Sequence, residues 1–254
     1  MKIDTVKQKL VTQLKQYCQK NGFQDVVLGL SGGLDSAVVL ALACEALGSH
    51  HVHTLMMTTK YTSLKSIELA QEAATLNHVS HQVINIQPTV DNLMKTLPFS
   101  PQNPVVEQNI QARARGVVAM AYSNEYNWLL LACGNKSELS VGYCTLYGDM
   151  CGGLAPIGDI YKTDVYKLAE YFNHEGRFFI PNGIIQRPPT AELANEQKDT
   201  DSLPPYPILD NILKNYLSDD KIVPDDIKNQ VELIRQRYQK SAFKRLQSSQ
   251  IIHI

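Results

Sequence analysis

The first half of the chain alternates short strand-like segments with longer segments of helical spacing. The strand-like segments, rich in apolar residues, are 26–30, 51–57, 81–86 and 128–133. The helical segments between them are 36–47, 62–76 and 107–126. Short apolar runs are typical of parallel strands covered on both faces, and intervening helices supply the crossovers. The sequence therefore predicts an α/β fold, a doubly wound, mostly parallel sheet with helices on both faces.

Outside this alternation the pattern is less regular. A helix is predicted over 4–21 with Asp4 as its cap, and Thr163 is a candidate cap for a later helix. The stretch 181–207 is rich in proline and polar residues, and within it we expect a mobile loop at about 194–206 that covers a ligand site. From about 224 to 254 we expect a helical tail.

The composition is that of one globular domain. With 254 residues, 44% hydrophobic and 19% charged, the chain can bury a full core, so we expect a single domain over 1–254. A net charge of -1 gives no general attraction to nucleic acid. No stretch approaches the roughly 18 apolar residues of a membrane span, and the N-terminus lacks the apolar run of a secretion signal. We expect a cytoplasmic protein without a membrane or nucleic-acid partner.

The cysteines argue against several classes of site. They are five in number and none is spaced as CxxC. The odd number and the lack of CxxC spacing speak against zinc ribbons, thioredoxin-type redox pairs and disulfide frameworks, so we interpret the cysteines as small apolar side chains.

The segment Gly29–Ser36 reads GLSGGLDS and lies between the first strand and the helix that follows it. A Ser-Gly-Gly turn at a helix N-terminus directs backbone N–H groups and a positive partial charge to one point, which suits a phosphate group. Glycines at 32 and 33 permit positive φ and close approach of a ligand, and Ser31 and Ser36 add hydroxyl donors. The segment is therefore predicted to bind pyrophosphate.

Two common phosphate-binding motifs do not fit this loop. The Walker pattern requires Gly-Lys-Ser/Thr, whereas Leu34 and Asp35 follow Gly33, and GxGxxG cannot be placed. A carboxylate beside bound phosphate is repulsive unless a divalent cation lies between them, so Asp35 indicates magnesium. The alternative is a plain strand-to-helix turn in which Asp35 is a first-turn acid.

The string SGGLDS resembles the SGGxDS loop of the ATP pyrophosphatases, which have an adenine nucleotide alpha hydrolase-like fold and adenylate a substrate with loss of pyrophosphate. Further strings resemble NAD synthetases in particular, and they occur in the same order over most of the chain. These strings are EQNIQAR at 107–113, GNKSE at 134–138, TLYGD at 145–149, APIGDIYKT at 155–163 and QKDTDSLPPY at 197–206.

This resemblance implies a carbon–nitrogen ligase that catalyses the last step of NAD biosynthesis. Deamido-NAD and ATP would give an adenylated intermediate and pyrophosphate, and ammonia would then yield NAD and AMP. It also implies a homodimer, which the long helical segment 107–126 would suit.

The resemblance assigns residues to ATP and magnesium. The ATP contacts would be Gly29, Leu30, Ser31, Gly32, Gly33, Leu34, Asp35, Ser36, Cys133, Lys162 and Thr190. Asp35 and Glu138 would ligate magnesium as hard oxygen donors. Asp35 and Lys162 would be catalytic, because a lysine near the bridging oxygen offsets charge as pyrophosphate departs. Read without the resemblance, Glu138 is a helix-capping acid and Lys162 a solvated helix start.

The resemblance also assigns contacts with deamido-NAD. They would be Arg113, Leu146, Asp149, Phe243 and Lys244, with Lys244 reaching the dinucleotide of a partner subunit. A guanidinium suits a phosphate or carboxylate, and a carboxylate suits donor groups. By themselves, Arg113, Asp149 and Lys244 read as surface charges.

Three positions depart from the pattern of many ammonia-using members. Those members carry threonine, lysine and histidine where this chain has Cys133, Leu146 and Phe243. The strings TLYGD and FKR instead resemble the branch that includes glutamine-dependent synthetases. The 28 residues before the loop leave no room for a preceding glutaminase domain, so we expect free ammonia, or a separate amidotransferase, as the nitrogen donor.

Two other functions stay open at this point. The first is another adenylating ATP pyrophosphatase, such as a tRNA-modifying enzyme, which a neutral chain without CxxC does not favour. The second is a non-catalytic ATP-binding module, which would not need Asp35, Glu138 and Lys162 together.

Overall fold

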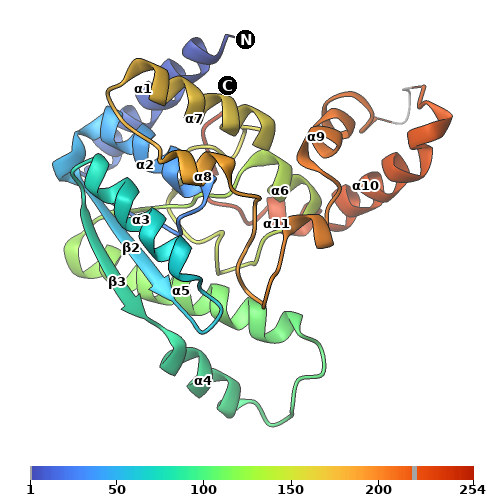
Figure 1. Ribbon diagram of the computed structural model, residues 1–254, viewed down its shortest axis with the longest axis horizontal. Coiled ribbons are helices and arrows are strands. Elements are labelled where there is room, and N and C mark those ends of the chain that lie inside the picture. The colour runs from blue at the N-terminus through green and yellow to red at the C-terminus, as the bar shows by residue number, and fades with distance from the viewer. Residues whose placement is uncertain (1, 219–221) are drawn as a thin grey trace.

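The computed structural model describes residues 2–218 and 222–254, and a single sheet forms its centre (Figure 1). In the described ranges the strand order is β3-β2-β1-β4-β5-β6, and each neighbouring pair is parallel. The strands are β1 (Val26–Gly29), β2 (Val52–Thr58), β3 (Ser80–Asn85), β4 (Leu129–Leu131), β5 (Leu154–Ala155) and β6 (Gln250–Ile251). The α/β fold with a parallel sheet is confirmed.

Helices follow or separate most of these strands. The α-helices are α1 (Ile3–Asn21), α2 (Leu34–Leu47), α3 (Leu64–Leu76), α4 (Gln87–Thr96), α5 (Val105–Tyr126), α6 (Lys136–Val141), α7 (Lys162–Glu175), α8 (Asn182–Gln186), α9 (Tyr206–Asn215), α10 (Lys228–Lys240) and α11 (Ala242–Arg245). Short 3-10 turns occur at Ser49–His51, Asp199–Asp201 and Asp225–Ile227. None of the helices in the described ranges is long and apolar enough to cross a membrane.

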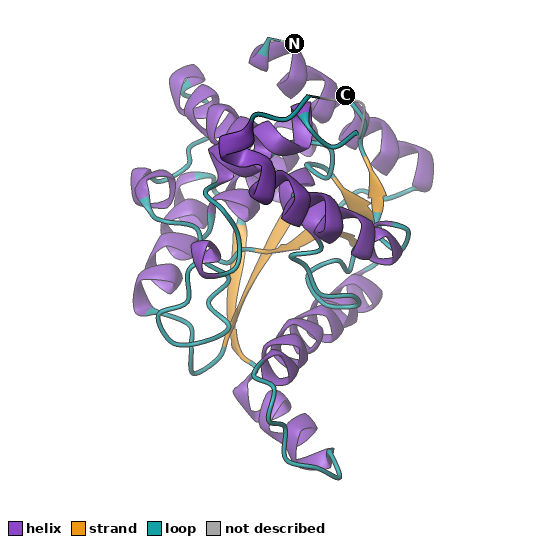
Figure 2. Cartoon of the chain, turned by 90° about the vertical axis from the view of Figure 1, so that its right-hand side faces the viewer, coloured by secondary structure: helices purple, strands orange, loops and turns teal. Residues whose placement is uncertain are grey.

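Successive residues of a strand point to opposite sides of the sheet, so a continuous apolar run such as β1 places apolar side chains on both faces. Val26 and Leu28 of β1 belong to the core cluster that α1, α2 and α7 cover, whereas Val27 belongs to the cluster beneath α5. Figure 2 shows the strands enclosed between these helices. Helices α9 and α10 pack with residues from the end of α6 into a third cluster, at the right of Figure 1. The predicted helices on both faces are confirmed.

Several predicted boundaries were wrong. The N-cap of α1 is Lys2, so Asp4 lies in the first turn, and the N-cap of α7 is Tyr161, so Thr163 lies inside that helix. A Thr or Asp near a helix start is compatible with either position, and the side chains here leave the cap without a hydrogen bond. The predicted tail of 224–254 is helical only to Arg245, after which β6 joins the sheet beside β5.

The sequence also missed α4 and α9. No helix was predicted within the proline-rich stretch 181–207, but α8 lies within it and α9 begins at Tyr206. Within the stretch expected to be mobile, 194–206, a 3-10 turn at Asp199–Asp201 places the Asp199 side chain in the interior. Proline at the first turn of a helix is tolerated, which is why the proline-rich stretch did not exclude α9.

Candidate active site

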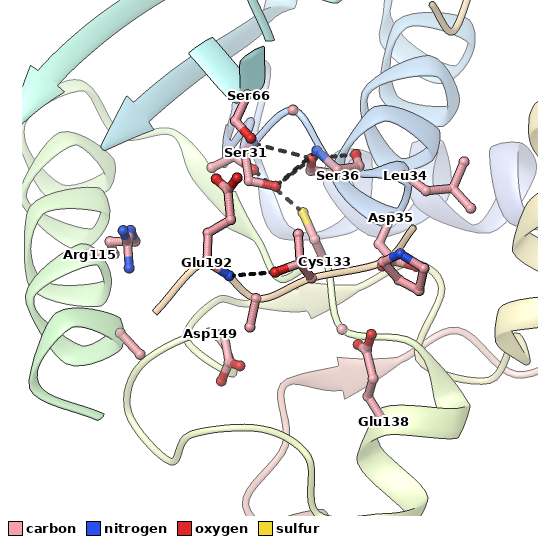
Figure 3. Close-up of a pocket in the computed structure, with 18 of the residues that line it drawn as sticks. Ser31, Leu34, Asp35, Ser36, Ser66, Arg115, Cys133, Glu138, Asp149 and Glu192 are labelled. Atoms are coloured by element: carbon pink, nitrogen blue, oxygen red, sulfur yellow. Dashed lines mark hydrogen bonds between the residues drawn. The ribbon is translucent and has the colours of Figure 1, made fainter. Parts of the chain in front are cut away.

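A cleft of about 320 Å³ opens at the carboxyl edge of the sheet, where ligands bind in folds of this class. Its walls come from the segments that follow β1, β2 and β4, from one face of α5, and from residues 187–193. Figure 3 shows Ser31, Asp35 and Ser36 on one side of this cleft and Asp149 and Glu138 on another. Segments far apart in the chain meet here because parallel strands end at one edge.

The loop from Gly29 to Ser36 has the geometry of a phosphate-binding turn. Gly32 has φ +76° and Gly33 is the N-cap of α2, so the loop ends at a helix N-terminus. Ser31 Oγ accepts a hydrogen bond from Gly33 N at 3.3 Å, and Ser36 Oγ donates to Gly33 O at 3.0 Å. These bonds hold the turn in shape before any ligand arrives.

Gly32 cannot carry a side chain in this conformation. A Cβ at Gly32 would lie 2.3 Å from the backbone oxygen of Ser66. We expect Gly32→Ala to lower the free energy of unfolding by about 3 kcal/mol or to displace the loop, with loss of ATP binding. Thermal unfolding and titration with an ATP analogue measure the two effects.

The matched control for that variant is Gly22→Ala. Gly22 has φ +75°, but a Cβ there would meet nothing within 4 Å. It therefore carries the backbone strain alone, about 1 kcal/mol, and should leave ATP binding unchanged. Equal effects of the two variants would contradict the close approach at Ser66.

Asp35, Lys162 and Glu138 form one charged cluster beside the loop. Lys162, the first residue of α7, is 3% exposed, and its Nζ donates to Asp35 Oδ2 and lies 3.5 Å from Glu138 Oε1. Asn135 joins the two acids, because its Nδ2 donates to Asp35 Oδ1 at 3.1 Å and its Oδ1 caps α6 through Glu138 N at 3.0 Å. Two carboxylates thus share one ammonium.

The pKa values in the cluster reflect this excess of negative charge. Burial by itself would lower the pKa of Lys162, but the carboxylates of Asp35 and Glu138 raise it above its ordinary value, so the ammonium stays charged. Burial raises the pKa of Glu138 to about 8, and Lys162 opposes that shift while Asp35 adds to it. Glu138 is therefore the carboxylate that the single ammonium satisfies least.

A second layer of side chains lies behind this cluster. Tyr206 Oη donates to Asp199 Oδ2 at 2.7 Å and lies 3.2 Å from Glu138 Oε1, while its ring lies 5.2 Å from Lys162 Nζ. Tyr143 Oη also donates to Asp199, at 3.1 Å. Asp199, which is 4% exposed, thus links the loop after residue 188 to Glu138 and Lys162.

We expect Tyr206→Phe to lower both stability and turnover. The change leaves buried Asp199 with one fewer donor, which costs about 1–3 kcal/mol, and it releases Glu138 from its contact. Thermal unfolding and steady-state rates measure the loss, which we place near 10-fold in kcat. Tyr122→Phe is the control, because the Tyr122 hydroxyl bonds an exposed Gln82 outside the cleft. Equal rates for the two variants would contradict a role for Tyr206.

Hydrogen bonds and an ion pair hold residues 187–193 at the opening of the cleft. Arg187 donates to Ser66 Oγ and pairs with Glu192, and Ser63 Oγ donates to Glu192 Oε1 at 2.8 Å. Thr190 Oγ1 is occupied by Gln197 O and Glu192 N. The segment therefore closes against the start of α3 in this structure.

The structure brings most of the ATP candidates together. Gly29, Ser31, Gly32, Gly33, Leu34, Asp35, Ser36, Cys133, Glu138, Lys162 and Thr190 all line the cleft. Leu30 does not, because its side chain is fully buried in the core. Burial raises the pKa of the Cys133 thiol, so this sulfur lies near Gly29 as a neutral group.

The candidates for deamido-NAD are more dispersed. Asp149 lines the cleft, and its Oδ1 accepts from Thr145 N at 2.6 Å. Arg113 is exposed outside the cleft, and its Nε donates to Leu146 O at 3.2 Å. Phe243 is 53% exposed, and Lys244 Nζ donates to the carbonyls of Gly142 and Cys144.

Several ionisable or hydroxyl side chains of the cleft region were not singled out from the sequence. Among them are Arg115, Arg187, Glu192, Asp199 and Tyr206. Asp199 and Tyr206 lie in the string QKDTDSLPPY, which was read only as a family signature. Arg115 could not be preferred to Arg113 from the sequence, because the rotation of α5 about its own axis decides which of the two faces the cleft.

Comparison with known proteins places the chain in a family. Residues 6–248 match the family described as NAD synthase. The glutamine-dependent NAD(+) synthetase of Acinetobacter baylyi is 46% identical over 97% of this chain and 47% of its own length. The chain thus spans about half the length of the curated relatives it matches.

Solved structures agree. An NMN synthetase from Francisella tularensis superposes with a TM-score of 0.84 at 29% identity over 96% of both chains. A glutamine-dependent NAD+ synthetase from Acinetobacter baumannii in complex with ADP gives 0.72 at 38% identity over 99% of this chain and 48% of that one. An NH3-dependent NAD synthetase from Campylobacter jejuni gives 0.76 at 29% identity over 96% of both. The family match, the shared fold and the loop-centred cleft lead to one conclusion: the chain belongs to the NAD synthase family.

Proposed function

We propose that this protein is an ATP-dependent ligase that converts deamido-NAD to NAD, with release of AMP and pyrophosphate. The observation that carries the proposal is the cluster of Asp35, Lys162 and Glu138 beside a phosphate-binding loop at a helix N-terminus. A module that only bound ATP would not need a buried ammonium shared by two carboxylates. The Acinetobacter baumannii relative was solved in complex with ADP, which supports use of an adenine nucleotide.

The first half-reaction follows from the charges. The loop amides and Ser31 hold the phosphates of ATP, and a carboxylate oxygen of deamido-NAD attacks the α-phosphorus while the bond to pyrophosphate breaks. Lys162 offsets the negative charge that develops on the leaving pyrophosphate, and its raised pKa keeps the ammonium charged throughout.

The second half-reaction consumes ammonia. Its nitrogen attacks the adenylated carboxyl carbon, the bond to AMP breaks, and one N–H proton is lost. Asp149 is the carboxylate that lies across the cleft from the loop in Figure 3, and it can accept that proton.

The donor set of this site fits magnesium. Asp35 and Glu138 are hard oxygen ligands, and the single Lys162 ammonium between them does not neutralise both carboxylates. Within the described ranges no group of three or more His, Cys, Asp or Glu side chains could hold a metal alone. Magnesium commonly takes one or two carboxylates and completes its shell with substrate phosphates and water. When bound, it would supply positive charge to the pyrophosphate.

We propose free ammonia, or a separate amidotransferase, as the source of nitrogen. The curated relatives are named glutamine-dependent, whereas the Campylobacter jejuni protein is named NH3-dependent. Ammonium and glutamine compared at equal concentration test this part, since NAD formed from glutamine by the chain alone would contradict it.

A second candidate substrate is the mononucleotide counterpart, nicotinic acid mononucleotide. The observation that favours it is the fit to the NMN synthetase over 96% of both chains. Phe243 and Lys244, proposed for the dinucleotide, lie outside the cleft, which is consistent with either substrate unless a partner subunit supplies contacts.

One assay tests the function. The protein is incubated with ATP, magnesium and ammonium and with either deamido-NAD or nicotinic acid mononucleotide, and the amidated product and AMP are quantified. We expect NAD and AMP in equal amounts. Release of ADP in place of AMP, or no amidated product from either substrate, would overturn the proposal.

We also propose that the protein is a cytoplasmic homodimer. Helix α5 covers one face of the sheet, and Val117 in the middle of this helix is 67% exposed. An exposed apolar side chain on a long surface helix suits an isologous contact. Sedimentation at working concentration tests this proposal, which a monomer would contradict.

A further inference from the structure

The charged side chains that line the cleft do not balance one another. The carboxylates are Asp35, Glu138, Asp149, Glu192 and Asp199, and the cations are Arg115, Lys162 and Arg187. Lys162 is paired with Asp35 and Glu138, and Arg187 is paired with Glu192. Arg115 is the cation of this cleft that pairs with no carboxylate in the described part of the chain.

Arg115 is held in place by its own backbone contact. It projects from the inner face of α5, and its Nε donates to Met57 O, near the end of β2, at 3.0 Å. The two terminal nitrogens of Arg115 donate to no described residue, and they are accessible from the cleft. Figure 3 shows Arg115 on α5, with Glu192 and Asp149 between it and the side of the cleft that carries Asp35 and Glu138. The guanidinium is therefore already oriented, with its terminal N–H donors available to a ligand.

Its neighbours on α5 leave room for that ligand. Ala112, Gly116 and Ala119 line the same side of the cleft, and none of them extends beyond a methyl group. Burial lowers the pKa of Arg115 to about 10, and Glu192 and Asp149 act in the opposite direction. The side chain is thus positively charged at neutral pH, in surroundings that solvate it poorly.

A charged guanidinium without an anionic partner in such surroundings is unfavourable in free energy, and an anionic ligand removes this cost. We propose that Arg115 binds a substrate oxyanion in the inner cleft, in the bidentate manner typical of arginine with carboxylate or phosphate groups. The inference rests on the proposed function, in which two polyanions must meet in a cleft with more acids than bases. The oxyanion comes from the carboxylate or phosphates of deamido-NAD, or from a phosphate of ATP.

Binding measurements on Arg115→Met and Arg115→Lys test this inference. Calorimetric titrations with deamido-NAD alone, and with α,β-methylene-ATP and magnesium alone, distinguish the two sources. We expect Arg115→Met to weaken binding of one of these ligands by roughly 10- to 100-fold and of the other by less than about 3-fold. Arg115→Lys should recover only part of the loss, because an ammonium cannot bind two oxygens in parallel.

Arg177→Met is the matched control. Arg177 is an exposed arginine outside the cleft, so its loss should change neither dissociation constant. A purely structural role for Arg115 predicts a lower unfolding temperature with unchanged affinity for both ligands, and that result would overturn the proposal. If Arg115→Met does not fold, Arg115→Lys with unchanged affinity for both ligands would overturn it equally.

Failure of the proposed function has a different signature. Wild-type protein that binds the ATP analogue but not deamido-NAD would contradict the proposed substrate, and Arg115 would then be judged on the ATP analogue alone. Wild-type protein that binds both ligands, with Arg115→Met binding both equally well, contradicts only the role of Arg115.

Discussion

Asp35→Asn is expected to leave the protein folded and to reduce the rate of NAD formation by about 10³-fold or more. The Asp35 carboxylate contacts Lys162 and Asn135 beside the phosphate loop and is not part of the apolar core, and in the variant Lys162 keeps Glu138 as a partner. Removal of the Asp35 carboxylate takes away one of two magnesium donors and the anchor of the ammonium. Circular dichroism checks the fold, and kcat measured over a range of magnesium concentrations checks the chemistry.

Asp4→Asn is the control that distinguishes this function from ordinary helix electrostatics. Asp4 and Asp35 both lie in the first turn of a helix, where an acid stabilises the helix by about 0.3–1 kcal/mol. If Asp35 were only such an acid, both variants would lose that much stability and keep full activity. Retained activity with normal magnesium dependence in Asp35→Asn would therefore contradict the assignment of Asp35 as a magnesium ligand beside bound ATP.

The fold was largely accessible from the sequence because its central strands are continuous apolar runs. β1 and β4 are buried on both faces, so their composition alone marks them. β5 and β6 have two residues each, which is too short for any periodicity, and β6 lies at the end of a tail that reads as helical up to that point. Their pairing is a tertiary effect that local sequence does not encode.

The candidate site divides in the same way. The phosphate loop is contiguous, so its residues could be assigned together. Lys162 was assigned only by resemblance, because its burial between Asp35 and Glu138 depends on how α7 packs on α2. Arg113 and Arg115 are two residues apart on one helix and so point in very different directions. The resemblance named Arg113, but the structure directs Arg115 into the cleft.

Lys162→Met is expected to stop NAD formation almost completely and also to make stability depend on pH. Methionine fills the space of the lysine stem in a position that is 3% exposed, so the packing of α7 is preserved. Without the ammonium, the charge on the leaving pyrophosphate is no longer offset, and we expect kcat to fall by about 10³-fold. Single-turnover release of pyrophosphate measures this half-reaction directly.

The effect on stability follows from the two carboxylates left behind. Removing one partner of a buried ion pair costs about 3 kcal/mol when the other group stays charged. Burial already raises the pKa of Glu138 from its usual 4.5 to about 8, and Lys162 opposes that shift, so its loss raises the pKa further. A carboxyl with a higher pKa in the folded state stabilises the fold when protonated, and this stability is lost as pH rises.

Thermal unfolding without magnesium at pH 5 and at pH 9 checks that pH dependence. The part of the difference between Lys162→Met and wild type that depends on Glu138 should be small at pH 5, where Glu138 is protonated in both proteins, and should grow above the wild-type pKa of about 8, so that it is larger at pH 9. Lys167→Met is the control on the same helix, because Lys167 is 61% exposed and should show no such dependence. An equal difference at both pH values would mean that Lys162 does not lower the pKa of Glu138. Added magnesium should reduce the difference at pH 9, because a divalent cation can replace the missing ammonium between the same two carboxylates.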